Sequence, residues 1–465
     1  MQLGDLLDDC SLDVQTSSIE IGQVEIDSRH CLPGTLFLAL DGGATHGARF
    51  AADAVARGAV AVVASEQMDL TVPVVVVPES QLRPLVAHAS ASVSGHPESK
   101  VELVGVTGTN GKTTVTALVS ALASSLDWNS ASIGTLTNER TTPAPPELFR
   151  TLRDLVDGFD KTKQRSVVAL EVSSHALVQR RVEGLRFAVV AFTNLSHDHL
   201  DYHGSMDEYY AAKAQLFTSE HAQSAVIWCD DPYGEKLASS TSLGVTEVRR
   251  SDAHDVATSL RGTTFFWRNH LINTPLVGDF NVDNALLAMA ILSTLGASDA
   301  EIAHAMSDVH NVRGRFEVVS SVGVMVIVDY AHTPDGLRRV LGDVRVLAPG
   351  ARVVTVFGCG GDRDRTKRPE MGKVASTYSD VTIVTSDNPR SESPEAIIDA
   401  VMSGVVAEAN VLRVSDRRAA IARAFELAQR GDVIVLAGKG HETTQTVGGD
   451  VVALDDRAIA LEFLE

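Results

Sequence analysis

Short runs of apolar, mostly β-branched residues alternate with amphipathic helical stretches along the 465-residue chain. This alternation predicts an α/β fold in which helices cover parallel sheets. A helix is expected over 48–57. The runs expected to form strands are 34–40, 59–64, 72–78, 101–106, 167–171, 188–192, 225–228, 324–329, 353–357, 381–385 and 433–437.

The chain length predicts two to four domains, and the pattern divides into three. We expect an N-terminal domain over 1–97, a central domain over 98–312 and a C-terminal, Rossmann-like domain over 313–465. The polar stretch 94–100 is typical of a linker between the first two.

A glycine loop gives the central domain its predicted character. The strand-like run 101–106 leads into Gly108-Thr109-Asn110-Gly111-Lys112-Thr113-Thr114 and then a helical pattern. Loop amides and a helix N-terminus form a phosphate cradle, in which Lys112 would reach the outer phosphates and Thr113 would bind Mg²⁺. Val106 stands where the usual spacing has its first glycine. The motif predicts a P-loop NTPase-like sheet, with a plain strand–helix turn as the alternative.

Polar residues follow the next two predicted strands. Glu171 ends one of them, and a carboxylate at a strand tip near a P-loop commonly completes the Mg²⁺ shell of a nucleotide. His197 and His199 follow the other strand, and their spacing allows a zinc interpretation. No cysteine accompanies them, so the nucleotide context favours Mg²⁺.

Two helical positions have a plain and a functional interpretation. Lys213 lies in an alanine-rich helical stretch, where the sequence alone favours an exposed lysine. Asn281 and Asn284 are three apart at a helix start. Asn281 could cap the helix, or the two amides could recognise an adenine edge.

Four polar loops follow strands of the C-terminal segment and carry mixed Arg, Asp, Asn and Glu residues. Ligands of open α/β sheets bind beyond the carboxyl ends of the strands, so such loops predict a zwitterionic ligand. Solvated charged loops are the alternative. The four loops are 329–336, 358–368, 386–392 and 438–442.

Composition narrows the class of protein. The net charge of −20 argues against nucleic-acid or anionic-membrane binding, although local basic loops could still hold an anionic substrate. The four cysteines are far apart and form no C-x-x-C, which is typical of reduced thiols in a cytoplasm. The N-terminus lacks a signal-peptide pattern and no apolar run is long enough for a membrane span, so we expect a cytoplasmic protein.

Ordered blocks over nearly the whole chain resemble the Mur ligase family of bacterial cell-wall synthesis, especially the members that add the third amino acid. The resemblance implies that ATP phosphorylates the free D-glutamyl carboxylate of UDP-MurNAc-L-Ala-D-Glu and that an amino acid's amine then attacks the acyl phosphate. It also implies a monomer using ATP and Mg²⁺. The matching blocks are 27–29, 33–37, 107–114, 171–175, 193–201, 211–213, 278–284, 314–317 and 329–334.

The resemblance assigns roles residue by residue. It implies catalysis by Lys112, Lys213, His199 and Glu171. The implied metal positions are Thr113, Glu171, His199 and a carbamoylated Lys213. Since a free ammonium repels Mg²⁺, a carbamate would explain a lysine at such a site. The implied ATP contacts are Gly108, Thr109, Asn110, Gly111, Lys112, Thr113, Thr114, Asn284, Arg315, Asp329 and His332.

At two places the sequence departs from the pattern of this family. Both departures concern contacts to the muramyl substrate rather than the class of reaction. His46 precedes a glycine where many relatives have aspartate, and the stretch 133–142 is shorter than usual. The implied substrate contacts are Ser28, Thr141, Thr142, Ser173, Gln179 and Arg181.

The added amino acid is expected to be meso-diaminopimelate, since Asp387-Asn388-Pro389-Arg390 matches the pattern associated with it. Arg363 and Arg390 could bind the distal carboxylate by two-point hydrogen bonding. Lysine lacks that carboxylate and would leave Arg390 unpaired. The residues expected to take the distal ammonium are Asn388, the Gly438 carbonyl and Glu442.

Three alternatives remain from the sequence. The same ligation could use L-lysine or another diamino acid. A folylpolyglutamate-synthase-like ligase would share the P-loop, although the blocks at 27–29 and 387–390 argue against it. A nucleotide-binding regulator without chemistry is the third. The residues whose presence argues against it are Lys112, Glu171, His199 and Lys213.

Overall fold

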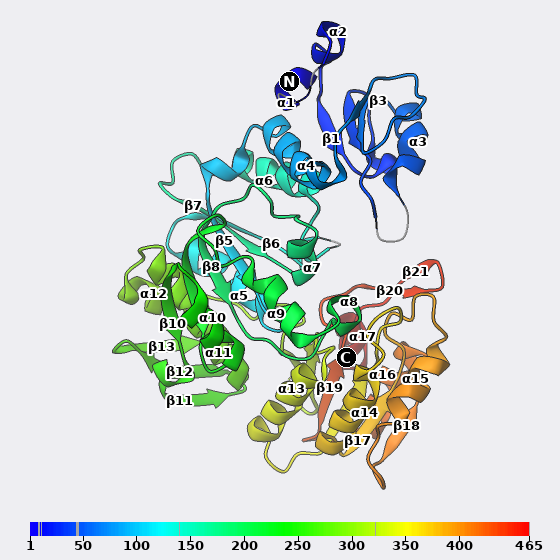
Figure 1. The fold of residues 1–465 in the computed structure, drawn as a ribbon. Helices are drawn as coiled ribbons and strands as arrows, with labels where there is room; N and C mark the ends of the chain where they lie inside the picture. The colour runs from blue at the N-terminus through cyan, green and yellow to red at the C-terminus, as the bar shows by residue number, and fades with distance from the viewer. Residues whose placement is uncertain (8–9, 11, 43–45, 139, 321, 465) are drawn as a thin grey trace.

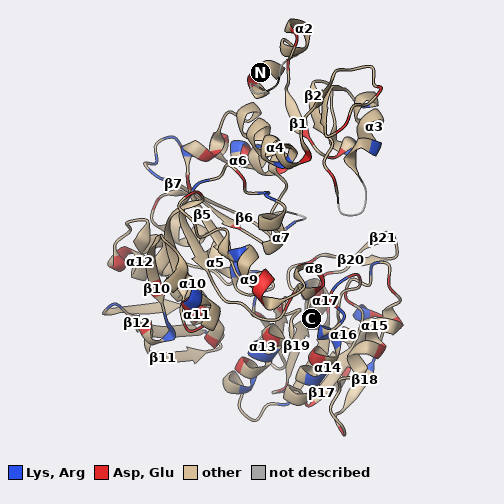
Figure 2. Ribbon diagram, in the orientation of Figure 1, with Lys and Arg blue, Asp and Glu red and all other residues tan. Residues whose placement is uncertain are grey.

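The computed structural model describes residues 1–7, 10, 12–42, 46–138, 140–320 and 322–464. Three main sheets follow one another along the chain, coloured blue, cyan to green, and yellow to red in Figure 1. This is the α/β architecture predicted from the sequence. Acidic and basic residues are interspersed along the ribbon (Figure 2). Within the described ranges, no helix is long and apolar enough to span a membrane.

The N-terminal sheet is parallel, with the order β1-β2-β3-β4. Its strands are β1 Gln23–Glu25, β2 Thr35–Leu38, β3 Ala59–Ala64 and β4 Val74–Val76. The predicted helix over 48–57 is formed by a 3₁₀ turn followed by an α-helix. The surrounding helical elements are α1 Leu3–Leu6, α2 Val14–Ser17, η1 Ser28–His30, η2 Gly47–Phe50, α3 Ala51–Ala56, α4 Glu79–Val93 and η3 Pro97–Lys100.

The central sheet is parallel, with the order β10-β9-β8-β5-β7-β6. Its strands are β5 Glu102–Thr107, β6 Asn129–Ile133, β7 Ser166–Glu171, β8 Phe187–Phe192, β9 Ala222–Trp228 and β10 Gly244–Val248. Because β5 lies in the middle, between β7 and β8, the loop after it is flanked by the ends of both neighbours. This places the predicted phosphate loop beside Glu171 and the loop after β8.

Helices pack on both faces of this sheet, and apolar residues fill both interfaces. The helical elements are α5 Lys112–Ser125, α6 Pro145–Gly158, α7 Ser174–Val178, α8 Leu200–His203, α9 Met206–Ala214, α10 Pro232–Ser240, η4 Arg250–Asp252, α11 Asp279–Thr294 and α12 Asp299–Ala305. A small antiparallel sheet consists of β11 His254–Ser259, β12 Gly262–Trp267 and β13 His270–Thr274.

The C-terminal sheet has the order β14-β15-β19-β16-β17-β18, with only the edge strand β14 antiparallel. Its strands are β14 Glu317–Ser320, β15 Met325–Asp329, β16 Val353–Phe357, β17 Val381–Val384, β18 Val411–Arg413 and β19 Val433–Ala437. One core packs α13 Pro334–Leu347, α14 Lys367–Tyr378 and α15 Pro394–Met402 on this sheet. Another packs α16 Arg417–Leu427 and α17 Asp456–Leu464. A hairpin, β20 Thr444–Val447 and β21 Asp450–Ala453, follows β19.

Every run predicted as a strand overlaps a strand of the structure. The strands that the pattern missed are short or rich in polar residues, such as β6 and the hairpin β20–β21. Hydrophobic runs indicate buried strands, whereas β6 lies at the edge of its sheet and all residues of β21 are exposed.

Candidate functional site

A large cavity joins the loops at the carboxyl ends of the central and C-terminal sheets. All four polar loops of the C-terminal sheet contribute to it, so the interpretation as separate solvated loops is wrong. The predicted site residues that line it are Thr109, Asn110, Gly111, Lys112, Thr113, Thr114, Thr141, Glu171, Ser173, His199, Asn284, Arg315, Asp329, His332, Arg363, Asp387, Asn388, Arg390, Gly438 and Glu442.

The phosphate loop depends on two glycines with positive φ, Gly108 at +147° and Gly111 at +87°. The Lys112 ammonium donates to the Gly108 carbonyl at 3.0 Å and to the Thr109 carbonyl at 2.8 Å. Burial lowers the pKa of Lys112, and Glu171 and Asp198 act in the opposite direction. Lys112 is thus held at the start of α5, where the helix N-terminus also favours an anion.

Replacing Gly108 with alanine is expected to destabilise the protein by roughly 2 kcal/mol or more. A Cβ there would lie 1.9 Å from Thr193 Oγ1 and 3.1 Å from the Asn194 backbone. Thermal and denaturant unfolding should detect the loss. Gly158→Ala is the matched control, because no atom lies within 4 Å of its added Cβ. Equal stability of the two variants would contradict the close approach at Gly108.

Glu171 is held by three donors at the end of β7. Thr113 Oγ1 donates to its Oε2 at 3.0 Å, and the Thr135 amide and hydroxyl donate to the two oxygens at 2.8 and 3.2 Å. Burial lowers the pKa of His199 to about 3, so this imidazole is neutral and has a free lone pair near neutral pH. A carboxylate, a hydroxyl and a neutral imidazole fit an Mg²⁺ bound mainly through phosphates and water.

Lys213 is 1% exposed, so the interpretation as an exposed helical lysine is wrong. Its Nζ lies 4.6 Å from the centre of the Tyr209 ring and donates to the Gly108 carbonyl at 2.8 Å. Burial, reinforced by nearby Lys112, lowers the pKa of Lys213 well below its ordinary value. The side chain therefore lies behind the phosphate loop as an amine that loses its proton readily.

Asn284 lies directly above the phosphate loop. A Cβ added at Gly111 would be 2.5 Å from Asn284 Oδ1. Asn281 accepts a hydrogen bond from Asn284 at 3.1 Å and donates to the Val277 carbonyl at 2.7 Å. The helix is capped by Gly278, so capping by Asn281 is wrong. An apolar wall beside Asn284 has the character of a base-binding slot and consists of Trp228, Phe280, Leu287 and Val340.

Arg315 reaches across from the C-terminal domain and donates to Thr113 Oγ1 at 2.9 Å. Asp329 stabilises this approach, because its carboxylate accepts from the Phe316 and Ala331 amides, each at 2.6 Å. Burial raises the pKa of Asp329 to about 6. Contact between the two domains thus places Arg315 at the end of the phosphate loop.

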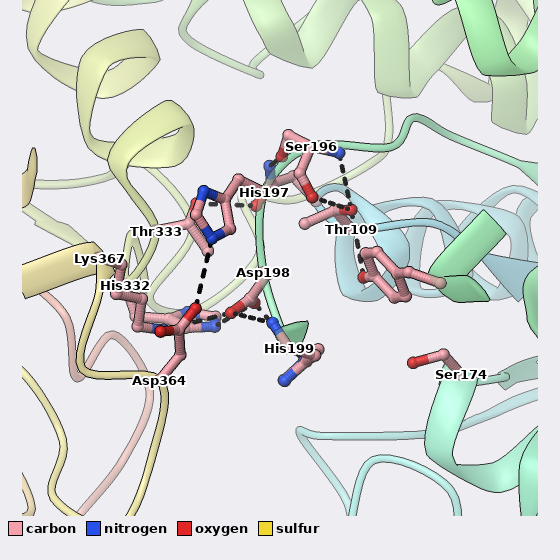
Figure 3. Close-up of polar contacts among 12 residues, drawn as sticks. Thr109, Ser174, Ser196, His197, Asp198, His199, His332, Thr333, Asp364 and Lys367 are labelled. Carbon is pink, nitrogen blue, oxygen red and sulfur yellow. Dashed lines mark hydrogen bonds and ion pairs between the residues drawn. The ribbon is translucent and has the colours of Figure 1, made fainter. Parts of the chain in front are cut away.

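The sequence analysis missed a buried ion pair between the same two domains. Lys367 Nζ donates to Asp198 Oδ1 at 3.3 Å, and this oxygen also accepts from the His199 amide at 3.0 Å (Figure 3). His332 approaches the other Asp198 oxygen at 3.8 Å. The signal in the sequence was an aspartate between two histidines at a strand end, but the cation beside it is 169 residues away.

The loop that carries Arg390 is paired with the hairpin. Arg390 has a φ of +53°; its amide donates to the Thr446 carbonyl at 3.1 Å and its carbonyl accepts from the Gly448 amide at 2.7 Å. Arg390 Nη1 also donates to the Gly361 carbonyl at 2.7 Å. Burial lowers the pKa of Arg390, and the nearby charge of Arg363 adds to this effect. Two guanidinium groups therefore adjoin one side of the cavity.

Asn388 and Glu442 meet across two loops of the C-terminal sheet, with Asn388 Nδ2 donating to Glu442 Oε2 at 2.8 Å. Asp387 is buried beside them, and burial raises its pKa. The structure thus brings cationic and anionic groups of the C-terminal loops into the lining of the cavity that also contains the phosphate loop.

The residues expected to contact the muramyl substrate are more dispersed. Thr142 is fully buried and donates to the Glu171 carbonyl at 2.8 Å. It therefore supports the backbone of Glu171 and does not line the cavity in the described part of the chain. Gln179 and Arg181 line a second cavity together with residues of the N-terminal segment and α4. Ser28 is a buried residue of η1 and lines neither of these two cavities in the described part of the chain.

His46 and the stretch 133–142, where the sequence departs from the family pattern, lie near this second cavity. His46 caps η2, since its Nδ1 accepts from the Ala48 amide at 3.2 Å. Within the shortened stretch 133–142, Glu139 lies outside the described residues. Thr141 accepts a hydrogen bond from Thr135 at 3.2 Å at the cavity edge.

Known proteins match the chain over its whole length. Residues 20–106 match the Mur ligase family catalytic domain, 106–292 the Mur ligase middle domain and 314–440 the Mur ligase glutamate ligase domain. UDP-N-acetylmuramoyl-L-alanyl-D-glutamate–2,6-diaminopimelate ligase from Geobacillus thermodenitrificans is 42% identical over 95% of this chain and 94% of its own. The corresponding enzyme of Syntrophomonas wolfei is 39% identical over 100% and 99%.

A solved structure of a UDP-N-acetylmuramoyl-L-alanyl-D-glutamate–2,6-diaminopimelate ligase agrees with the fold. It superposes with a TM-score of 0.66 at 30% identity and covers 100% of this chain and 98% of its own. The order of the three matched regions, the phosphate loop and the full-length similarity lead to one conclusion. The chain belongs to the Mur ligase family.

Proposed function

We infer that this chain catalyses the ATP-dependent addition of meso-2,6-diaminopimelate to UDP-MurNAc-L-Ala-D-Glu in peptidoglycan precursor synthesis. Relatives that share its full length carry this activity in their names. The observation that supports it best is that one cavity is lined both by the phosphate loop and by Arg363, Arg390, Asp387, Asn388 and Glu442. In this proposal, ATP and the zwitterionic amino acid would bind in the same cavity.

The three predicted segments divide the substrates in this proposal. Residues 1–97 would hold the uridine end, 98–312 the ATP and 313–465 the amino acid. Ser28, Gln179 and Arg181 would contact the muramyl substrate outside the main cavity, and Thr141 and Ser173 inside it. The enzyme would act as a cytoplasmic monomer.

The first step moves the γ-phosphoryl group of ATP to the free D-glutamyl carboxylate and releases ADP. Such transfers depend mainly on position and charge neutralisation. Lys112 and Arg315 supply positive charge on either side of Thr113. Asn284 and the apolar wall beside it would hold the base.

Mg²⁺ would be held by Thr113, Glu171, His199 and a carbamate on Lys213, and when bound it would neutralise phosphate charge. The buried Lys213 amine fits this proposal, because a neutral amine is the form that reacts with CO₂. The nitrogen would attack the carbon of CO₂ and lose a proton, which would convert the neutral amine into a carbamate anion next to the phosphate loop.

The second step forms the amide bond. The amine nitrogen of the incoming amino acid attacks the acyl carbon, phosphate leaves, and the nitrogen loses its proton. Arg363 and Arg390 would bind the distal carboxylate, and Asn388, Glu442 and the Gly438 carbonyl the distal ammonium. Recognition of the distal end would then place the reacting amine near the acyl phosphate.

The test is ATP-dependent phosphate release with UDP-MurNAc-L-Ala-D-Glu and either meso-diaminopimelate or L-lysine. We expect release with diaminopimelate and little with lysine, because lysine would leave Arg390 unpaired. Release with lysine instead would keep the ligase reaction and overturn the choice of amino acid. No release with either acceptor would overturn the proposed function.

A further inference from the structure

Lys439 follows β19 and lies behind the end of the cavity proposed to bind the amino acid. Its side chain is 0% exposed, and it is absent from the residues that line this cavity in the described ranges. Its neighbours Gly438 and Glu442 do line it. The ammonium donates to Glu442 Oε2 at 2.8 Å and to the Thr444 carbonyl at 2.6 Å. Lys439 therefore contacts residues that line the cavity and would not contact a ligand bound in it.

One ammonium here faces carboxylates from two loops. Lys439 Nζ lies 3.7 Å from Asp387 Oδ1 and 3.5 Å from Asn388 Oδ1. Asp387 is 7% exposed, and its Oδ1 has no hydrogen-bond partner among the described residues. Buried charges are stable only when they are paired, so Lys439, together with Arg417, balances the charges of Asp387 and Glu442, which repel each other.

The two carboxylate oxygens of Glu442 differ in their hydrogen bonds. Oε2 accepts from both Lys439 and Asn388. No hydrogen bond to Oε1 is present within the described residues. Burial acts to raise the pKa of Glu442, but Lys439 and Asn388 outweigh it, so the pKa lies below its ordinary value. Glu442 is thus ionised, oriented and left with one oxygen for a cationic ligand.

We propose that Lys439 is a positioning residue for the incoming diamino acid, which holds Glu442 and Asn388 ready to receive the distal ammonium. This inference rests on the function proposed above. Without the ammonium, Glu442 would lose the one cation in ion-pair contact with it among the described residues, and Arg417 would remain as the main cation acting on Asp387. One carboxyl would then keep its proton near neutral pH and would no longer attract the substrate ammonium.

Lys439→Met tests this by removing the charge while keeping the length of the side chain. We expect the KM for diaminopimelate to rise about 10-fold or more at neutral pH, with the KM for ATP and for the muramyl substrate nearly unchanged. Raising the pH from about 6.5 to about 8.5 should recover part of this loss, because the carboxyl then ionises. The groups that interact electrostatically with Glu442 are Lys439, His441, Asp387, Arg390, Arg417 and Tyr330.

Lys373→Met is the matched control, since Lys373 is exposed on α14 of the same domain. The double variant Lys439→Met/Glu442→Gln removes both charges of the pair. It therefore leaves no unpaired Glu442 carboxylate that could prevent folding. If Lys439 acts through Glu442, the KM for diaminopimelate of this double variant should match that of Glu442→Gln alone. Additive losses, or an equal and pH-independent change in all three KM values, would overturn the inference.

The wild-type enzyme separates this inference from the proposed function. A wild type that is inactive with UDP-MurNAc-L-Ala-D-Glu and every diamino acid would overturn the function itself. An active wild type together with a Lys439→Met variant that behaves like Lys373→Met would overturn only the role of Lys439.

Discussion

Replacing Lys112 with alanine is expected to lower turnover by on the order of 10³-fold or more. The Lys112 ammonium lies at the start of α5 and is already aimed at the loop carbonyls of Gly108 and Thr109. Phosphoryl transfer depends on neutralising charge on the moving group. Lys213, which also contacts the loop through the Gly108 carbonyl, lies behind it and is absent from the cavity lining in the described part of the chain. ATP-dependent phosphate release with both co-substrates measures the effect.

The control for this variant is Lys373→Ala, which removes an exposed lysine far along the chain. Its turnover should equal that of the wild type. Thermal unfolding of Lys112→Ala should remain close to wild type, since the ammonium bonds only to carbonyls of its own loop. Near-normal turnover in Lys112→Ala would exclude the phosphate-loop assignment.

The phosphate loop was predictable because its information is local. A strand, two glycines and a helix start lie within a few residues, and the Val106 departure did not alter the geometry, since β5 continues through that position to Thr107. The same holds for the loops after β15, β16, β17 and β19. Parallel strands place their carboxyl ends at one edge, so a polar loop after each strand is enough to predict a shared site.

Burial and long-range pairing were not predictable in the same way. Lys213 looked like an exposed helical lysine, but its environment is set by Gly108, 105 residues earlier. Asp198 and Lys367 form their buried pair only when two domains meet. Lys439 stands between two glycines after a buried strand, yet nothing local reveals that it faces Glu442 rather than solvent. Such side chains acquire their role from the packing of separate elements.

Loops of both the central and the C-terminal sheet line the cavity, and side chains of the two domains contact each other there. Arg315 of the C-terminal domain completes the phosphate loop through Thr113. The Lys367–Asp198 pair holds the backbone of His199 from the same direction. Under the proposed function, Arg315 and His199 would therefore be in place to act on the phosphates only when the C-terminal domain is docked against the central one.

Arg390→Ala is expected to raise the KM for meso-diaminopimelate about 100-fold while the KM for ATP stays within about 2-fold. The guanidinium is held beside Arg363 by the Gly361 carbonyl and by backbone pairing with the hairpin β20–β21. In the proposed complex it binds the distal carboxylate, which lysine lacks. The variant should therefore lose most of its preference for diaminopimelate over L-lysine. Steady-state kinetics with each amino acid measure both effects.

Two further variants separate recognition from folding. Arg390→Lys keeps the charge but loses the planar two-point geometry, so it should recover only part of the affinity. Arg423→Ala removes an exposed arginine whose ion pair with Glu426 lies on the surface of α16, and its kinetics should match the wild type. Because Arg390 has a positive φ, alanine and lysine are strained alike there, and backbone strain cancels between these variants. A uniform rise in the KM for ATP and for diaminopimelate would contradict the assignment and indicate a distorted loop instead.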